Sequence, residues 1–278
     1  MQGNGWLANA MISQEEPSAV LERREFLRLA VGTAVAVGND GVASAGDPEP
    51  RRIKAVAFDA FPIFDPRPIS NLAEEMFPGK GAEFSSEWKT RQFEYTWLRT
   101  LTGQYEDFWH VTQDALGYAA AKLSVGMDQA KAERLMAAYL KLKAWPDVVP
   151  VLRSLKDAGI RLGFLSNFTE PMLRSCIESA GLNGFFEQIL STDRVKAFKP
   201  DRRSYEIGVE AFRLRKEEIA FAAFAGWDAV GAAAFGYPTF WVNRTRATPE
   251  QFGPQPNATR TDLVDLPAFI RGGSKARD

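Results

Sequence analysis

Short apolar runs and helical patterns alternate through most of the chain. Four mainly apolar runs have the pattern of buried strands: 53–59, 160–167, 219–226 and 239–243. A weaker fifth run covers 186–192. Between them, apolar residues recur at helical spacing over 148–158, 171–180, 203–212 and 229–235. Apolar strands that alternate with helices predict an α/β fold, in which helices cover both faces of a parallel sheet.

One long segment, about 67–145, departs from this alternation. It contains no strand pattern, only four helical patterns, at 69–77, 86–101, 104–123 and 128–142. Because it directly follows the first predicted strand, we expect a helical cap over 67–145, inserted into a core formed by 46–66 and 146–278. The tail after Arg244 is rich in turn residues before a last short segment near 262–270.

The first 45 residues have the pattern of a targeting signal. Arg23 and Arg24 precede a nine-residue apolar run, 29–37, and residues 43–45 (Ala-Ser-Ala) form a small-residue cleavage site. Nine residues are too few to span about 30 Å of hydrocarbon, which favours a secretory signal peptide over a membrane anchor. The paired arginines resemble the twin-arginine type, so we expect export by the twin-arginine machinery, a periplasmic location in a bacterium and no stable membrane anchoring after cleavage. An ordinary amphipathic helix is the alternative.

Composition narrows the classes of function. The chain is 45% hydrophobic and 25% charged, as in globular proteins, and its formal net charge is −1. We therefore expect no nucleic-acid partner. The one cysteine, Cys176, excludes an intrachain disulfide, and with the one histidine, His110, it excludes zinc sites built from several Cys and His ligands. Cys176 lies in a helical pattern and is predicted to be an inert, buried thiol.

Polar residues stand where the predicted strands end. Asp59 ends the first strand, Ser166 and Asn167 end the second, Lys199 lies in the loop after the weak fifth run, and Asp228 follows the run 219–226. In an open parallel sheet, ligands bind at the carboxyl ends of the strands. A carboxylate, a hydroxyl, a cation and a second carboxylate would supply a nucleophile, a neutral donor, a counter-charge and a group that manages water.

Four motifs contain these residues, in order around the predicted cap: FDAFPIFD, LSNFT, FKPD and GWDAVGAAAFGYPTFWVNR. Their order and spacing resemble the haloacid dehalogenase (HAD) superfamily, over essentially the whole chain after the signal. The segments RQFEYTWLRTLTGQYEDFW and FGYPTFWVNR are most similar to its type II 2-haloacid dehalogenase branch. The resemblance implies a HAD-like Rossmannoid sheet with a cap and a hydrolase that converts short 2-haloalkanoic acids into 2-hydroxy acids and halide, with no metal and no other cofactor.

Asp59 takes the place of the nucleophile in this resemblance. It would attack the carbon that bears the halogen, and water would then hydrolyse the resulting ester. The phosphatase branch has a second aspartate two positions on, which serves as general acid and contributes a magnesium site through its carbonyl. Phe61 stands there in this chain. A halide is a weak base that leaves without protonation, so Phe61 at this position favours carbon–halogen chemistry. The alternative for Asp59 is that it only forms a turn or caps a helix.

The resemblance implies supporting roles for five other residues. Lys199 would neutralise Asp59 or a developing oxyanion, and Asp228 would orient Lys199 or the water. Ser166 and Asn167 would hold the substrate carboxylate through a hydroxyl and a backbone N–H. Tyr205 corresponds to a hydrogen-bonding tyrosine of the family. The alternatives are a solvated lysine and residues that only cap helices or form turns.

The cap is expected to complete the substrate pocket. Lys89 and Phe93 lie four positions apart, on one face of a helix, and a cation beside an aromatic ring fits a small anion with an apolar carbon. Phe61, Phe108 and Trp227 match positions that line the halogen pocket in the family. Plain core packing is the alternative for these aromatic residues.

The chain departs from the family pattern near the predicted site. Lys89 replaces an arginine and loses its bidentate fork, and the loop after the nucleophile is one residue shorter, with Pro62 in place of Gly-Thr. Ala223 and Ala225 replace a serine and an asparagine that help to position water. Two alternatives stay open: a hydrolase of the same fold acting on another small carboxylate or phosphate ester, and a non-catalytic protein that binds a small carboxylate. A homodimer is expected only by analogy with the family.

Overall fold

Six parallel strands form the core sheet of the computed structural model, which describes residues 53–272. Every neighbouring pair in the sheet runs parallel. In spatial order the strands are β5 (Gln188–Ser191), β4 (Arg161–Ser166), β1 (Ala55–Phe58), β6 (Ile219–Ala223), β7 (Thr239–Val242) and β8 (Ala258–Arg260). The predicted α/β fold with a parallel sheet is confirmed. The predicted signal over 1–45 lies outside the described residues.

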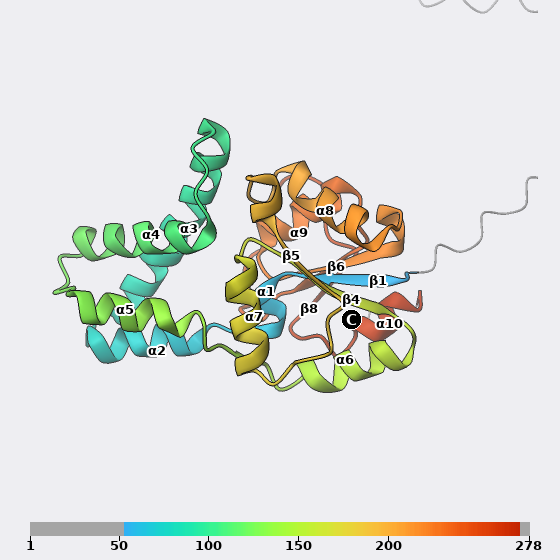
Figure 1. Cartoon of the computed structure of the whole chain (residues 1–278), viewed down its shortest axis with the longest axis horizontal. Helices are drawn as coiled ribbons and strands as arrows, with labels where there is room; N and C mark the ends of the chain where they lie inside the picture. Colours follow the sequence, from blue (N-terminus) through green and yellow to red (C-terminus); the bar gives the residue numbers. More distant parts are fainter. Residues whose placement is uncertain (1–52, 273–278) are drawn as a thin grey trace, which may run out of the picture. The chain divides into compact units, whose positions relative to one another are not determined.

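Helices cover both faces of the sheet (Figure 1). Ala55 and Ala57 of β1 point to a hydrophobic cluster that includes α8 (Arg202–Phe212) and α9 (Gly226–Phe235). Val56 and Phe58 point to the opposite face, which is covered by three helices: α6 (Val148–Asp157), α7 (Glu170–Ser179) and α10 (Leu266–Ile270). Because all four residues of β1 are buried, it reads as a continuous apolar run.

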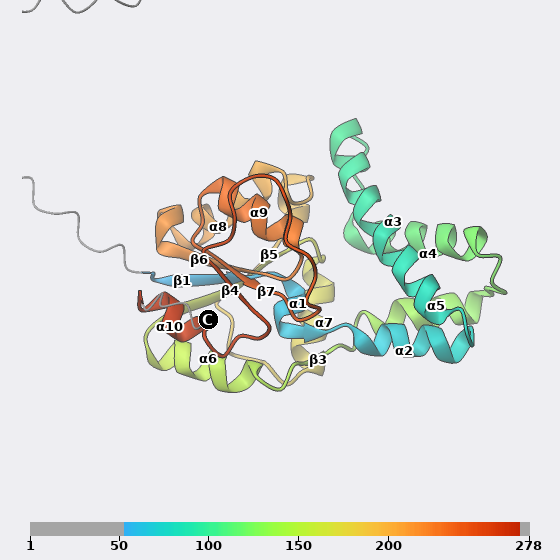
Figure 2. The same ribbon diagram turned by 180° about the vertical axis from the view of Figure 1, so that it is seen from behind.

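The segment after the first strand is helical, as predicted. In both views it forms a group of four helices apart from the sheet (Figures 1 and 2): α2 (Arg67–Met76), α3 (Gly81–Thr102), α4 (Phe108–Lys122) and α5 (Gln129–Ala138). Asp107 caps α4 by accepting from the backbone N–H of His110, which explains why α4 begins later than the predicted residue 104. The predicted cap limits, 67 and 145, stay a prediction.

A one-turn helix and a two-stranded sheet, which the sequence did not reveal, join the two groups of elements. A one-turn helix, α1 (Ala60–Ile63), follows Asp59 and leads into β2 (Phe64–Asp65). β2 pairs antiparallel with β3 (Lys143–Ala144), where the chain returns from the cap. Strands of two residues are too short to produce a recognisable hydrophobic alternation.

One predicted strand boundary was wrong, and one strand was not predicted. The run 219–226 predicts a single strand, but β6 ends at Ala223, and Ala225 is the N-cap of α9. Asp228 therefore lies in the first turn of α9 and not at the strand end. The turn-rich tail also contains the edge strand β8, whose residues are only partly buried and so lack an apolar run. Two short 3₁₀ segments, η1 (Thr192–Val195) and η2 (Lys216–Glu218), complete the described elements.

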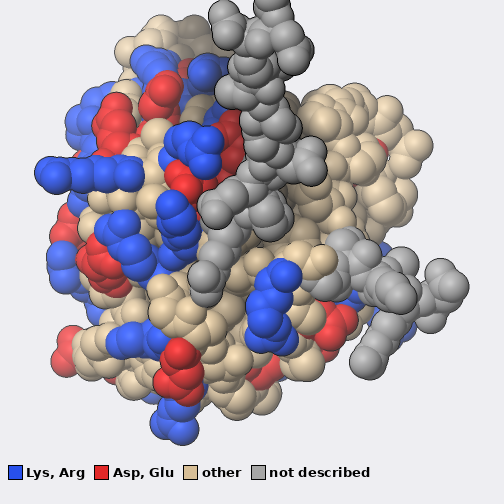
Figure 3. All heavy atoms as spheres, turned by 90° about the vertical axis from the view of Figure 1, so that its right-hand side faces the viewer, with Lys and Arg blue, Asp and Glu red and all other residues tan. Residues whose placement is uncertain are grey.

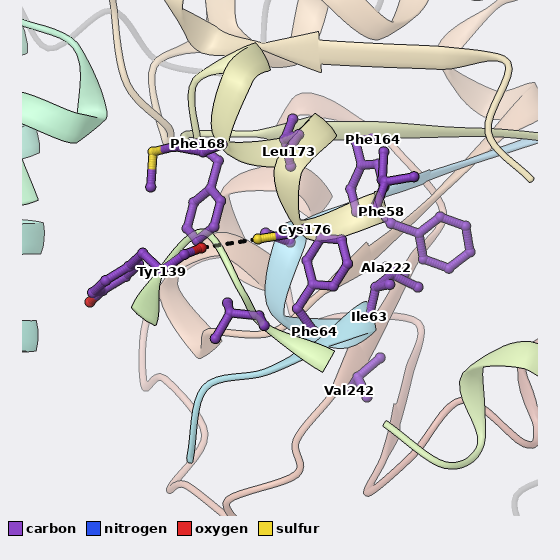
Figure 4. Packing of buried hydrophobic residues seen from close by; sticks show 14 of the residues in the cluster. Phe58, Ile63, Phe64, Tyr139, Phe164, Phe168, Leu173, Cys176, Ala222 and Val242 are labelled. Carbon is purple, nitrogen blue, oxygen red and sulfur yellow. Dashed lines mark hydrogen bonds between the residues drawn. The ribbon is translucent and has the colours of Figure 1, made fainter. Parts of the chain in front are cut away.

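Cys176 lies in the hydrophobic cluster on the α7 face (Figure 4). Its thiol donates a hydrogen bond to the carbonyl oxygen of Tyr139 at 3.0 Å, drawn as the dashed line in Figure 4. Burial raises the pKa of Cys176 to about 11, so the thiol is protonated near neutral pH. The predicted burial of Cys176 is confirmed, and its inertness stays a prediction.

The charged residues are mixed in sign on the face of the molecule seen in Figure 3, where basic and acidic side chains lie next to one another. None of the helices described between residues 53 and 272 has the length and apolar character that crossing a bilayer requires.

Candidate active site

Asp59 lies at the carboxyl end of the central strand β1. Its backbone N–H donates to the carbonyl oxygen of Ala222 at 3.0 Å, so the ladder between β1 and β6 continues to this residue. Its backbone is extended, and it is the N-cap of α1. The side chain is 14% exposed, so the carboxylate is largely enclosed but still reachable.

The two oxygens of the Asp59 carboxylate have different surroundings. Oδ1 accepts a hydrogen bond from Lys199 Nζ at 2.8 Å and another from Ser166 Oγ at 3.2 Å. Oδ2 accepts only one longer bond among the described residues, from the backbone N–H of Phe61 at 3.4 Å. Oδ1 is therefore held by a cation and a hydroxyl, whereas Oδ2 keeps lone pairs for a reaction.

Lys199 is shared between two carboxylates. Its ammonium lies 2.8 Å from Asp59 Oδ1 and 2.7 Å from Asp228 Oδ2, and its side chain is only 1% exposed. The second oxygen of Asp228, Oδ1, accepts the hydroxyl of Tyr205 at 2.7 Å. The predicted residues Asp59, Ser166, Lys199, Asp228 and Tyr205 thus form one connected hydrogen-bond network, assembled from β1, β4, the loop before α8, α8 itself and α9.

One cation between two carboxylates leaves one negative charge in excess, and the pKa values follow from this. Burial raises the pKa of Asp228 to about 6, and the charge of Asp59 adds to this effect against the opposing effect of Lys199. Burial alone would lower the pKa of Lys199, but the charges of Asp228 and Asp59 outweigh it and hold the pKa above its ordinary value. The lysine therefore stays charged, and Asp228 is the group that titrates near neutral pH.

The side chain of Asn167 is hydrogen-bonded within the protein, and the role predicted for its backbone N–H stays a prediction. Its side-chain oxygen accepts the backbone N–H of Lys199 at 3.1 Å and the hydroxyl of Thr192 at 3.3 Å. The amide side chain is thus used to position the loop that carries Lys199. Thr192, in η1, was missed by the sequence analysis because a threonine 25 positions after Asn167 gives no local signal of this contact.

Aromatic rings stand beside the carboxylate. Phe61, two positions after Asp59, packs edge-on against Phe168 with ring centroids 5.3 Å apart and lies 5.5 Å from Phe224. Phe108, at the start of α4, stacks on Phe168 at 5.4 Å. Phe61 and Phe108 are thereby joined through Phe168, a residue of the LSNFT motif that the sequence analysis did not assign to the site.

Cap and core also meet at Trp227. Its ring lies 5.3 Å from the ring of Phe93 and 5.6 Å from that of Trp97, both on α3. The predicted residues Phe93 and Trp227 are therefore in contact. Trp97 and Trp227 also line a cleft of about 750 Å³ that continues along α8 and α9.

Lys89 is not brought into the network. It is exposed on α3, and none of the hydrogen bonds or ion pairs found within residues 53–272 involves it. It lies one helical turn before Phe93, on the face that reaches Trp227.

The two alanines at positions where the family has polar residues lie at the end of β6 and at the start of α9, the helix that carries Asp228. Ala223 is the last residue of β6 and is fully buried in the cluster with α8 and α9. Ala225 is the N-cap of α9 and, unlike serine or asparagine, offers no side-chain acceptor to the helix. Phe224, between them, packs against Phe61. This loop therefore presents an apolar surface to the site.

The donor set of the site fits acid–base and nucleophilic chemistry. No group of three His, Cys, Asp or Glu side chains suited to a metal ion occurs in the part of the chain that the structure describes. Asp59 offers a nucleophilic oxygen, Lys199 and Ser166 offer donors to the other oxygen, and Asp228 offers a carboxylate that can take up a proton.

The chain is similar to known proteins over most of its length. A model of the haloacid dehalogenase-like hydrolases matches residues 53–236, which include every predicted catalytic residue. The haloacetate dehalogenase H-2 of Moraxella sp. (strain B) is 38% identical over 210 residues, 75% of this chain and 94% of that protein. The (S)-2-haloacid dehalogenase of Pseudomonas sp. (strain YL) is 39% identical over 212 residues, 76% of this chain and 91% of that protein.

The fold is also similar to that of a solved dehalogenase structure that contains a covalently bound substrate-like acid. The L-2-haloacid dehalogenase from Xanthobacter autotrophicus, with chloropropionic acid covalently bound, superposes with a TM-score of 0.74 at 31% identity. The match covers 79% of this chain and 99% of that one.

Proposed function

The chain belongs to the haloacid dehalogenase-like hydrolases, and from this membership we propose that it hydrolyses the carbon–halogen bond of short 2-haloalkanoic acids, with Asp59 as the nucleophile. One observation carries the proposal above all: Lys199 and Ser166 hold Oδ1 of Asp59, which leaves Oδ2 to react. The covalently bound chloropropionic acid in the Xanthobacter structure supports an ester intermediate.

The first step is a displacement at carbon. Asp59 Oδ2 attacks the carbon that bears the halogen, a C–O bond forms, and the C–X bond breaks with its electron pair leaving as halide. Phe61 stands at the position where a phosphatase of this fold has its general acid, and halide needs no proton to leave. Attack from the side opposite the halogen inverts the carbon, so an L-haloacid yields a D-hydroxy acid.

The second step is hydrolysis of the ester on Asp59. Water adds to the carboxyl carbon, and the negative charge develops on Oδ1, where Lys199 and Ser166 donate at 2.8 and 3.2 Å. Asp228, whose pKa lies at about 6, is ionised at neutral pH and takes up the proton from water. The bond between the Asp59 carboxyl carbon and the ester oxygen then breaks, and the proton held by Asp228 passes to the departing alkoxide to give the 2-hydroxy acid. The second proton of the water, left on the Asp59 carboxyl group, goes to solvent, so both carboxylates are restored.

The substrate carboxylate has a cation available from the cap. Lys89 lies one turn from Phe93, whose ring contacts Trp227 above the network. A carboxylate bound to this ammonium would place the apolar part of a short haloacid among Phe61, Phe108 and Trp227. A lysine holds the anion as a point charge, without the fork geometry of an arginine.

The test is halide release by the full chain in the presence of EDTA, from L-2-chloropropionate, chloroacetate and fluoroacetate. Asp59→Asn should abolish release, whereas Asp157→Asn, the same change at an exposed carboxylate of α6, should leave it intact. Magnesium-dependent phosphate release from p-nitrophenyl phosphate in buffer without EDTA, together with no halide release, would redirect the proposal to a phosphate-ester hydrolase. Stabilisation by small carboxylates with no product from any of the three would redirect it to a binding protein.

We further propose that residues 1–45 are a twin-arginine export signal and that the mature protein is periplasmic. Arg23-Arg24, the short apolar run and the small residues at 43–45 support this. Replacing both arginines by lysine should keep the protein out of the periplasmic fraction, and N-terminal sequencing of exported protein should begin near residue 46. Export of the double variant at the wild-type level would contradict the assignment.

A homodimer is also proposed. Leu98 and Leu101 on α3 are 51% and 83% exposed, and large exposed apolar side chains are typical of contact surfaces. Light scattering should report twice the chain mass for the wild type and a lower mass for Leu101→Lys. A monomeric wild type would refute the proposal.

A further inference from the structure

The one-turn helix α1 is held mainly from outside. A helix of four residues can satisfy only one of its carbonyls internally, and here Phe64 N–H donates to Ala60 O. The carbonyls of Phe61, Pro62 and Ile63 would otherwise lack partners in a largely buried loop. All three accept hydrogen bonds from two residues distant in sequence.

Trp145 supplies two of these donors. Its backbone N–H lies 3.1 Å from Ile63 O, and its indole Nε1–H lies 3.0 Å from Phe61 O and 3.1 Å from Phe64 O. Trp145 directly follows β3, at the point where the chain returns from the cap. The return linker and the nucleophile loop are therefore joined through one side chain.

Arg244 supplies the third donor. Its Nη2 lies 2.8 Å from Pro62 O, and its guanidinium makes a two-point contact with Asp147 at 2.9 and 3.0 Å. The Arg244 side chain is 6% exposed, and its guanidinium carbon lies 4.5 Å from the centroid of the Trp145 ring. Asp147 also accepts the backbone N–H of Leu263, which anchors the arrangement to the tail.

We propose that Trp145 and Arg244 are positioning residues that fix α1 and thereby hold the Asp59 carboxylate and the Phe61 ring in register with Lys199. The inference rests on the proposed function, since it assigns these two residues a part in that reaction. Neither contacts the Asp59 carboxylate, and they act through the carbonyls of Phe61 and Pro62. Trp145 lies 84 positions after Phe61 in the sequence, and Arg244 lies 182 positions after Pro62.

If α1 is fixed in this way, the groups that bind the substrate and the groups that set the geometry of attack lie in different parts of the molecule. The charges that would bind the substrate carboxylate lie on the cap, whereas α1 sets the distance and angle of attack by Asp59. A displacement of about 1 Å in a reacting group can cost roughly 100-fold in rate. Loss of the hydrogen bonds from Trp145 and Arg244 to α1 (the clamp) should therefore lower kcat/KM without weakening the binding of an unreactive carboxylate.

Trp145→Phe and Arg244→Lys test this with minimal loss of volume and charge. Each has a matched control elsewhere in the described chain. Trp88→Phe removes an indole bond of 2.8 Å to Thr112 O inside the cap, and Arg260→Lys removes a bond of 2.8 Å to Asp265. For L-2-chloropropionate we expect kcat/KM to fall about 10- to 100-fold in the two test variants and less than about twofold in the controls. The inhibition constant of propionate should stay within about twofold throughout.

Hydrogen exchange provides a readout that needs no activity. The amides of residues 60, 61, 63, 64 and 65 should exchange faster in Trp145→Phe and Arg244→Lys than in the wild type and in the controls. Unchanged exchange there, or kcat/KM within about twofold of the wild type in Trp145→Phe, would overturn the inference. If the wild type releases no halide, the proposed function fails, while the exchange comparison still decides whether the clamp holds the loop.

Discussion

Asp228→Asn is predicted to remove the acid limb from the pH profile of turnover. Asp228 accepts Lys199 Nζ at 2.7 Å and the Tyr205 hydroxyl at 2.7 Å. Asparagine has the same shape, and its oxygen can accept from Lys199 while its amide donates to the hydroxyl, which can also accept. The substitution thus removes the charge and the proton-accepting capacity and leaves the contacts in place.

The sign of the stability effect follows from the raised pKa. Burial raises the pKa of Asp228 from 3.8 to about 6, so the folded chain holds this proton more tightly than the unfolded chain. The contribution of Asp228 to stability therefore decreases as the pH rises from about 4 to about 6 and is constant above that. The decrease amounts to about 3 kcal/mol, at about 1.4 kcal/mol per pH unit of displacement. In Asp228→Asn this slope should be absent.

The effect on activity depends on the role of the ionised form. If Asp228 takes up the proton from water, kcat of the wild type should fall about tenfold for each pH unit below about 6. Asp228→Asn should lower kcat by about 100- to 10,000-fold above that pH, the range expected for a lost general base, and show no acid limb.

The assay is halide release between about pH 4 and pH 9, with urea unfolding over the same range. His110→Gln is the control, because a histidine also titrates near pH 6 and hydrogen bonding to Asp107 raises the pKa of this one. His110 is exposed on the cap, so its replacement should leave the limb unchanged. An acid limb that persists at the same pH in Asp228→Asn would refute the assignment.

Two further substitutions test packing around the site. In Gly231→Ala the new Cβ would lie 2.5 Å from the Tyr205 hydroxyl oxygen, so the free energy of unfolding in urea should fall by about 1–3 kcal/mol. In Gly117→Ala the new Cβ has open space around it, so the free energy of unfolding should rise by about 0.5–1 kcal/mol. Equal stability of both would contradict this. Tyr105→Phe removes a bond of 3.1 Å to Asp193 between cap and core and should cost about 1 kcal/mol in thermal unfolding, and an unchanged Tm would show that the bond contributes nothing.

Much of the hydrogen-bond network around Asp59 could be predicted because Asp59 and Ser166 stand at strand ends and Lys199 lies in a loop that follows a strand. Local apolar runs locate the strands, and parallel strands bring their carboxyl ends to one edge, so Asp59, Ser166 and Lys199 were expected to meet. Asp228 was also expected there, although the strand before it was drawn three residues too long. Its polar contacts depend on the first turn of α9, and an alanine N-cap gives no sequence signal for where that helix begins.

The hydrogen bonds that hold α1 and the loop of Lys199 could not be predicted, because they are made through the backbone. Trp145 and Arg244 act through backbone carbonyls of α1, which have no side-chain signature. The side-chain oxygen of Asn167 accepts the backbone N–H of Lys199, a contact that also leaves no side-chain signature at Lys199. Such contacts depend on which distant segments fold together. Residue type alone does not say which of several possible acceptors a given donor will find.

The departures from the family pattern bear on the second step more than on the first. Displacement needs a free Oδ2 on Asp59 and an apolar surface, and both are present. Hydrolysis needs an oriented water, yet Ala223 and Ala225 offer no side-chain hydrogen bond to it, and both oxygens of Asp228 already accept from other groups.

Ester hydrolysis should therefore limit turnover, so the ester on Asp59 should accumulate. Rapid mixing with excess L-2-chloropropionate should then release about one halide per site in a burst before the steady rate, since the first step precedes the slow one. Mass spectrometry of acid-quenched protein should find the 1-carboxyethyl group from the substrate, joined as an ester to the peptide that contains Asp59. A linear release with no burst would mean that displacement is the slow step, and that Lys199 and Asp228 suffice to direct the water without the two missing polar side chains.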